Sequence, residues 1–306
     1  MRTYSNNNYR TLLVILGIAV AAAGTGCSAQ EPQLLDFKSV SALFNYDFNA
    51  ELNIREKGSE RRGEIIIRDI AFTAGPRSEN VSAYLVIPSE PGPHPGILWV
   101  HWLGEENSNR AQFLDEAVTL AEHGAVSLLV NAMWSDSGWY EKRIPEEDYS
   151  NSIHQVIELR RAMDVLLSRQ GVDANRVAVV GHDYGGMYST IMGGVDQRAT
   201  TYVLVAVTPS LNDWAYFSTQ PKSQIQYVRE NAVFEIPMYL REIKNASVLF
   251  QFGKQDFFVS GAGAAIYFRS ANEPKERKWY DAEHEMNKPE IRADREAWLV
   301  RTLKLR

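Results

Sequence analysis

Short apolar runs and amphipathic stretches alternate along the chain from residue 63 to its end. Residues 63–74 and 81–88 have the pattern of strands, and we expect them to form an antiparallel pair. Short apolar runs typical of buried parallel strands follow at 97–102, 125–131, 176–181, 201–209 and 246–253, with a last strand at 276–282.

Amphipathic or helix-like stretches lie between these runs, at residues 110–124, 152–171, 185–194, 262–270 and 288–306. Alternation of this kind predicts an α/β fold with a mostly parallel central sheet and helices on both faces. Residues 211–245 interrupt it as a short, irregular insert after the sixth predicted strand. We therefore expect one α/β domain over 63–306, preceded by a polar tether and strap at 27–62.

The first 26 residues have the layout of an export signal. Residues 1–10 carry two arginines and no acid, an apolar run follows, and small residues lead to Cys27. This order resembles a bacterial lipoprotein signal, which implies a lipid anchor on Cys27 and a place in the cell envelope, at the outer membrane or the periplasmic face. The alternative is an ordinary signal peptide cut near Ala29.

Composition and charge exclude several kinds of partner and site. The formal net charge is -6 and no basic run occurs, so nucleic acid is not an expected partner. Cys27 is the only cysteine, so once it carries a lipid no thiol remains for a disulfide, a zinc site or a nucleophile. His94, His123 and His154 have no metal-ligand spacing. We expect a small-molecule ligand, with no metal and no cofactor.

Residues 176–190, RVAVVGHDYGGMYST, read as a buried strand, a cramped turn and the start of a helix. Gly181 and Gly185 stand two positions before and after Asp183. Tiny residues are needed there when a strained central residue is presented above a sheet edge. The segment resembles the nucleophile elbow of α/β-hydrolases, with aspartate where serine is usual.

In that family the nucleophile is followed along the chain by an acid and then a histidine. Asp256 follows the strand after the insert, and His284 lies on the loop after the final strand. A histidine in this role needs a carboxylate that fixes its tautomer. Asp281 and Glu285 are alternatives to Asp256. The candidate triad is Asp183, Asp256 and His284.

The family's oxyanion hole uses the amide after the nucleophile and one from the loop after the third strand. Tyr184 supplies the first, and the backbone at Trp102 or Leu103 supplies the second. We expect His101 to shape this loop rather than act as a base. His182 is expected to pack beneath the elbow.

Over residues 44–304 the chain resembles the dienelactone hydrolase-like branch of the α/β-hydrolases. The motifs that carry this resemblance are FNYDFNAEL, VSAYLVIPSEPGPHPGILWVHW, RRAMDVLLSRQGVDANRVAVVGHDYGGM, GKQDFFV and YDAEHEMN. That branch has cysteine or serine at the elbow. GHDYGG is instead similar to the elbow of epoxide hydrolases and of haloacid or haloalkane dehalogenases, which implies an aspartate nucleophile.

A carboxylate attacks a saturated carbon that bears a leaving group more usefully than it attacks an ester, where it would form a mixed anhydride. The foremost hypothesis is a hydrolase that opens an epoxide, or less readily cleaves a carbon–halogen bond, through an ester of Asp183. Two alternatives stay open: a carboxylesterase or lactonase with another role for Asp183, and a non-catalytic binding protein.

Aromatic residues of the insert and of residues 131–150 are candidates for the substrate pocket: Trp134, Tyr216, Tyr227 and Tyr239. The three tyrosines are also candidates for the acid that epoxide opening needs, or they simply pack the insert onto the domain. In a dehalogenase, Trp102 or Trp134 would have to hold the halide.

Overall fold

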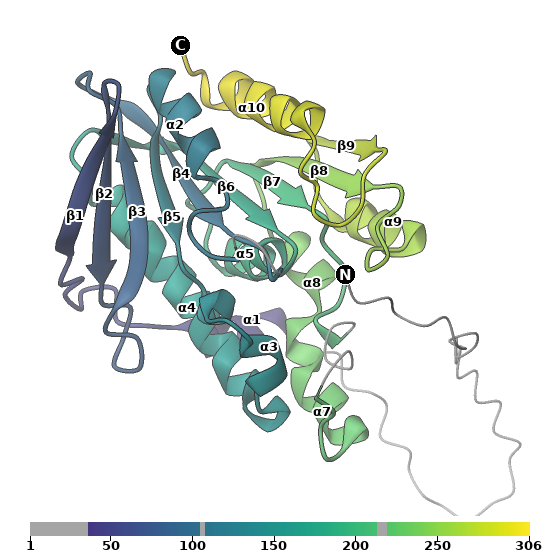
Figure 1. Cartoon of the computed structure of the whole chain (residues 1–306). Helices are drawn as coiled ribbons and strands as arrows, with labels where there is room; N and C mark the ends of the chain where they lie inside the picture. The colour runs from purple at the N-terminus through teal and green to yellow at the C-terminus, as the bar shows by residue number, and fades with distance from the viewer. Residues whose placement is uncertain (1–35, 105–107, 213–218) are drawn as a thin grey trace, which may run out of the picture. The chain divides into compact units, whose positions relative to one another are not determined.

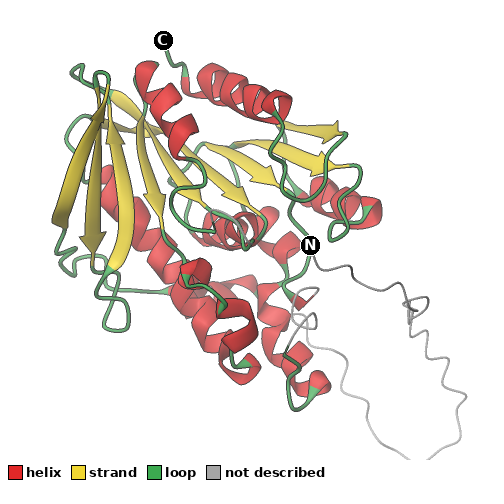
Figure 2. Cartoon of the chain, in the orientation of Figure 1, coloured by secondary structure: helices red, strands yellow, loops and turns green. Residues whose placement is uncertain are grey.

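The computed structural model describes residues 36–104, 108–212 and 219–306. The predicted export signal, Cys27 and Tyr216 lie outside these ranges. Within them the chain forms a nine-stranded twisted sheet with helices on both faces (Figures 1 and 2). No helix of these ranges is both long enough and apolar enough to cross a bilayer.

The strands follow the spatial order β1-β2-β3-β5-β4-β6-β7-β8-β9. Their bounds are β1 Arg55–Arg62, β2 Ile65–Phe72, β3 Val81–Ile87, β4 His94–Val100, β5 Val126–Val130, β6 Val172–His182, β7 Thr201–Val205, β8 Ser247–Gly253 and β9 Lys275–Tyr280. The first three strands and the β3–β5 pair are antiparallel, and every pairing from β5 to β9 is parallel. The predicted antiparallel pair corresponds to β2 and β3.

Strand β1 lies in the segment that the sequence pattern assigns to the tether and strap, so that assignment needs correction. All eight of its residues, REKGSERR, are exposed, and the strand pairs only with β2 at the edge of the sheet. Charged side chains on an edge strand discourage pairing with other chains. A strand without apolar residues gives no periodic signal, which is why the pattern misses it.

Helices α2 and α10 cover one face of the sheet, and α4 and α5 cover the other (Figure 1). The α-helices are α1 Phe37–Ser41, α2 Leu114–Glu122, α3 Trp139–Lys142, α4 Asp148–Leu167, α5 Tyr184–Val195, α7 Gln224–Asn231, α8 Ile236–Leu240, α9 Gly261–Ser270 and α10 Pro289–Leu303. The short 3-10 helices are η1 Ala42–Phe44, η2 Met133–Ser135, η3 Pro145–Glu147 and η4 Ala232–Phe234.

The central strands β4, β5 and β7 are buried along their whole length because helices cover both of their faces. Beyond the carboxyl ends of β4, β6, β8 and β9 come the loops that carry Leu103, Asp183, Asp256 and His284. Since parallel strands end at the same edge of a sheet, the fold gathers these four residues there.

Candidate active site

The turn between β6 and α5 holds Asp183 in a strained conformation. Its φ is 54° and its ψ is -120°, outside the regions that a side chain normally allows. A Cβ at Gly181 would lie 2.5 Å from the Gly185 carbonyl oxygen, and one at Gly185 would lie 2.3 Å from the Val100 oxygen. Only glycine at both positions lets the backbone make this turn, and the turn places Asp183 at the sheet edge.

The structure brings Asp183, His284 and Asp256 together. Asp256 Oδ2 accepts a hydrogen bond from His284 Nδ1 over 2.8 Å, and His284 Nε2 faces Asp183 Oδ1 at 3.4 Å. The second contact is long for a hydrogen bond. All three side chains are almost completely buried, with exposures of 0, 6 and 0% for Asp183, His284 and Asp256.

Asp256 is the acid that contacts the histidine. Its Oδ1 accepts hydrogen bonds from the backbone amides of Phe258, at 2.8 Å, and Val259, at 3.0 Å. These bonds fix the carboxylate while Oδ2 accepts from His284. The alternative Asp281 is exposed and accepts instead from Gln255 Nε2 at 2.6 Å. Glu285 is exposed as well.

This arrangement predicts different outcomes for two asparagine variants. Asp256→Asn removes the charge that supports a protonated His284 and permits the wrong tautomer, so any step in which His284 takes a proton should slow about 10²- to 10⁴-fold. Asp281→Asn is the matched control and should retain the wild-type rate. Steady-state turnover of both variants checks this. Equal losses of turnover in the two variants would contradict the role of Asp256 as the carboxylate that supports His284.

The His284 ring is held between two carboxylates. Burial alone lowers the pKa of His284, but Asp183 and Asp256 outweigh burial and raise it to about 10. At neutral pH the resting site therefore contains an imidazolium with a carboxylate on each side. Loss of the charge on either carboxylate lowers the pKa of His284.

Asp183 also contacts the candidate oxyanion hole. The Leu103 amide donates to Asp183 Oδ2 over 3.0 Å. The Trp102 amide instead donates to Gln112 Oε1 at 2.8 Å, so the expectation that it serves as an alternative oxyanion donor is corrected. Tyr184 directly follows Asp183 and is the first residue of α5, so its backbone amide lies at the N-terminus of that helix.

The peptide plane that presents the Leu103 amide is fixed from its other side. The Trp102 carbonyl, in the same planar unit, accepts from His101 Nδ1 at 2.8 Å, Trp134 Nε1 at 3.0 Å and Ser108 Oγ at 3.0 Å. Trp134 is only 1% exposed and is absent from the pocket lining described below. Its indole N–H therefore helps to orient the loop that presents the Leu103 amide.

His101 has the structural role that the sequence suggests. Because its Nδ1 donates to the Trp102 carbonyl, its Nε2 accepts, from Ser135 Oγ at 2.8 Å and from the Ala132 amide at 3.1 Å. Burial lowers the pKa of His101 to about 4, so the ring is neutral at physiological pH.

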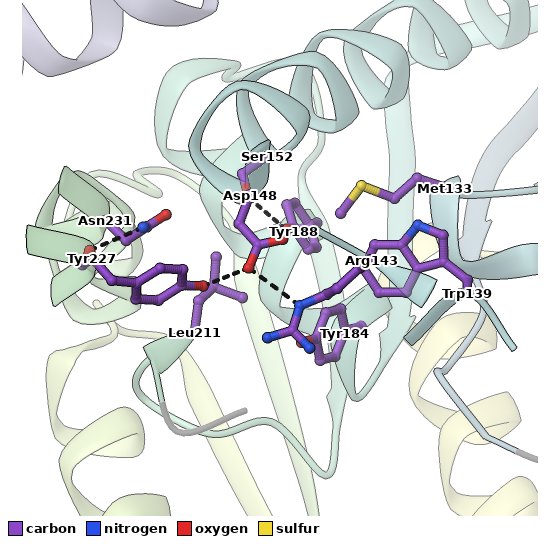
Figure 3. Close-up of a pocket in the computed structure, with 10 residues that line it drawn as sticks. All are labelled: Met133, Trp139, Arg143, Asp148, Ser152, Tyr184, Tyr188, Leu211, Tyr227 and Asn231. Atoms are coloured by element: carbon purple, nitrogen blue, oxygen red, sulfur yellow. Dashed lines mark hydrogen bonds and ion pairs between the residues drawn. The ribbon is translucent and has the colours of Figure 1, made fainter. Parts of the chain in front are cut away.

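A cavity of about 20 Å³, room for one or two water molecules, lies beside the elbow (Figure 3). Residues from α3, α4, α5, α7 and the loops after β5 and β7 line it, namely Met133, Trp139, Arg143, Asp148, Ser152, Tyr184, Tyr188, Leu211, Tyr227 and Asn231. Of the predicted pocket residues that the structure describes, only Tyr227 is in this lining. Tyr239 is fully buried, donates to the Val233 carbonyl and packs on Phe44, so it anchors the insert.

Polar groups occupy one side of this cavity. Asp148 Oδ2 accepts from Tyr227 Oη at 2.7 Å and from Arg143 Nε at 3.2 Å, as the dashed lines in Figure 3 show. Ser152 and Tyr188 share a hydrogen bond of 2.8 Å. Burial raises the pKa values of Tyr184, Tyr188 and Tyr227, so all three remain phenols.

Sequence reasoning missed Arg143, Asp148 and Gln112. Arg143 and Asp148 lie in RIPEED, where a run of charges is usually solvated, and Gln112 lies in a stretch that reads as a helix. The available signal was that Arg143 and Asp148 lie within residues 131–150, the segment whose aromatic residues are pocket candidates.

The sheet order, the elbow and the residues gathered at the sheet edge define the α/β-hydrolase fold. No family model and no curated protein sequence matches the chain. Among solved structures, it is similar to an acetyl xylan esterase from Paenibacillus sp. R4, with a TM-score of 0.70 and 20% identity over 87% of this chain and 93% of that one.

Two further structures have the same fold. Acetyl xylan esterase 1 from Thermoanaerobacterium sp. JW/SL YS485 has a TM-score of 0.68 and 18% identity, with coverage of 87% of this chain and 93% of its own. A protein from Klebsiella pneumoniae subsp. pneumoniae MGH 78578, assigned in name to the dienelactone hydrolases, has a TM-score of 0.59 and 18% identity. The match covers 79% of this chain and 99% of that one. At these identities the likeness establishes the fold.

Proposed function

We propose that this protein is a hydrolase in which Asp183 attacks a saturated carbon, preferentially that of an epoxide, and forms an alkyl-enzyme ester. The chemistry requires water and the chain's own side chains, with no cofactor. The observation that carries the proposal is the position of the Asp183 carboxylate, with Oδ2 on the Leu103 amide and Oδ1 turned toward His284.

This position suits an aspartate that becomes esterified on Oδ1. Oδ2 then becomes the ester carbonyl oxygen and is already on a hydrogen-bond donor that stabilises negative charge. A mechanism in which Asp183 merely activates water against a substrate ester needs this donor for the substrate's carbonyl oxygen. Since Asp183 Oδ2 occupies the Leu103 amide, the geometry favours the alkyl-enzyme route.

In the first half reaction, Asp183 Oδ1 forms a bond to one epoxide carbon, and the carbon–oxygen bond of the ring breaks. The electron pair goes to the departing oxygen, which needs a proton. That oxygen leaves from the side of the carbon opposite Oδ1, away from His284. We assign the proton to a tyrosine of the pocket wall, Tyr184 or Tyr227.

Ester formation removes the charge of Asp183, so the pKa of His284 falls and its proton can return to the tyrosinate. In the second half reaction, water bonds to the Asp183 carboxyl carbon and gives a proton to His284 Nε2. Negative charge develops on Oδ2 at the Leu103 amide. Collapse releases the former Oδ1 within a diol, protonated by the water's second hydrogen, and restores the carboxylate.

Halide substrates fit this site less well. The Trp134 indole N–H is engaged by the Trp102 carbonyl and is not directed at a leaving group, which removes one of the two candidates for holding halide. The tyrosine hydroxyls serve a departing oxygen better than a halide, which needs no proton.

Phenylalanine variants of the two tyrosines test this assignment. Tyr184→Phe, Tyr227→Phe or both should slow alkylation of Asp183 by an epoxide about 10²- to 10⁴-fold, the usual contribution of a general acid. Alkylation by a bromide of the same carbon skeleton should change little, because bromide leaves without a proton. Single-turnover mass spectrometry of a panel of epoxides, haloacids and activated esters measures both rates. Turnover of the esters alone, without any adduct, would refute the proposal.

A further inference from the structure

A chain of hydrogen bonds joins the oxyanion loop to the backbone of the catalytic histidine. The Trp102 amide donates to Gln112 Oε1 at 2.8 Å, Gln112 Nε2 lies 2.7 Å from His182 Nδ1, and His182 Nε2 lies 2.9 Å from the His284 carbonyl oxygen. The Trp102 ring also stacks on the His182 ring, with centroids 5.2 Å apart and planes 6° from parallel.

The backbone groups at the two ends of this series of hydrogen bonds determine which atom donates in each bond. A backbone N–H can only donate, so Gln112 Oε1 accepts at Trp102, and the Gln112 amide nitrogen must donate to His182 Nδ1. A backbone carbonyl can only accept, so His182 Nε2 carries the ring proton and donates to His284. The two ends demand the same tautomer of His182, with the proton on Nε2 and a lone pair on Nδ1.

The charges around His182 favour its neutral form. The ring is 1% exposed, and burial, the neighbouring His284 and Arg295 all lower its pKa well below the usual value. Arg295 is itself paired with Glu116 through two contacts of 2.6 and 2.8 Å. His182 therefore has neither the free proton nor the exposure of a catalytic acid or base.

We propose that Gln112 and His182 are positioning residues that fix the Leu103 amide, the oxyanion donor, and His284 in their positions relative to each other. Gln112 fixes the peptide that precedes the Leu103 amide, while His182 fixes the backbone of His284. Both groups act together when water attacks the alkyl-enzyme, whereas Asp183 alkylation uses only the Leu103 contact. This inference rests on the proposed function.

Two variants of the full chain test it. Gln112→Met keeps the length of the side chain but removes both hydrogen bonds. We expect hydrolysis of the epoxide-derived ester to slow about 10²-fold, the cost of a misplacement near 1 Å, and its formation to slow much less. The adduct on Asp183 should therefore accumulate.

Gln112→Glu is the matched conservative variant. Its carboxylate accepts from Trp102 as before. His182 can donate to this carboxylate and to the His284 carbonyl at the same time only when both of its ring nitrogens are protonated, a form that His284 and Arg295 oppose. The rate of ester hydrolysis relative to wild type should therefore decrease as the pH rises. Equal slowing of ester formation and hydrolysis in Gln112→Met, or a pH-independent rate ratio in Gln112→Glu, would overturn the positioning role.

A measurement without substrate separates this inference from the proposed function. Nitrogen-15 NMR of the histidine rings in the wild-type chain should find His182 protonated on Nε2 and not titrating between pH 6 and 8. A proton on Nδ1, or titration in that interval, contradicts the inference. If no reagent alkylates Asp183, the proposed function fails, and the ring assignment alone decides whether the hydrogen-bond chain exists.

Discussion

His284→Gln is expected to stop the protein after its first half reaction, with a covalent ester on Asp183. Glutamine cannot take a proton from water, so hydrolysis of the ester should fall about 10³-fold, within the range for loss of a general base. Alkylation itself needs only Asp183, the Leu103 amide and the pocket acid. Intact-protein mass spectrometry after exposure to an epoxide should show a gain of one epoxide mass, located on the peptide that contains Asp183.

His123→Gln is a suitable control, because His123 is exposed at the end of α2, and it contacts the Arg306 backbone. It should turn over at the wild-type rate without a trapped adduct. Loss of turnover in His284→Gln with no adduct from any epoxide or halide would instead indicate that His284 acts in a reaction without an alkyl-enzyme.

Asp183→Asn is expected to abolish both adduct formation and turnover. The amide matches the carboxylate in size and its oxygen can still accept from Leu103, but its nitrogen has no lone pair that attacks carbon. Turnover should fall by more than about 10⁴-fold, as for other covalent nucleophiles. Activity near the wild-type level would exclude Asp183 as the nucleophile.

The same variant has a pH signature in stability. The pKa of His284 is raised from 6.5 to about 10 in the folded protein, so its ion pairs stabilise the fold fully below pH 6.5, and this stabilisation is lost as the pH rises through 10. Asp183→Asn removes one of the two carboxylates. Between pH 6 and pH 10 its free energy of unfolding should therefore decline less than that of the wild type, as denaturant titrations can measure.

The fold and the order of the site residues were predictable because local rules and topology agree on them. Gly181 and Gly185 around Asp183 indicate a cramped strand-to-helix turn, and a parallel sheet places the ends of its strands at one edge. Asp256 and His284 follow two such strands, so their approach to Asp183 follows from the strand order. The choice of Asp256 over Asp281 needed coordinates, because both are one loop away from a strand.

The roles of the aromatic residues were not predictable from the chain. Trp134 and Tyr239 carry polar atoms that must be satisfied when buried, and the partners are backbone carbonyls, at Trp102 and Val233, that no side-chain pattern reveals. The pair of buried Arg143 and partly buried Asp148 escaped notice for a different reason. Charges close in sequence give no sign of whether the fold leaves them in water or encloses them.

The most direct test of the account is a single turnover of an epoxide in water labelled with oxygen-18, with the enzyme in excess. If Asp183 is the nucleophile, the oxygen added to the substrate is the former Oδ1, and water replaces it in the carboxylate. We therefore expect an unlabelled diol and one heavy oxygen in the peptide that contains Asp183. A labelled diol with an unlabelled Asp183 would show that water attacks the substrate directly and would contradict the account.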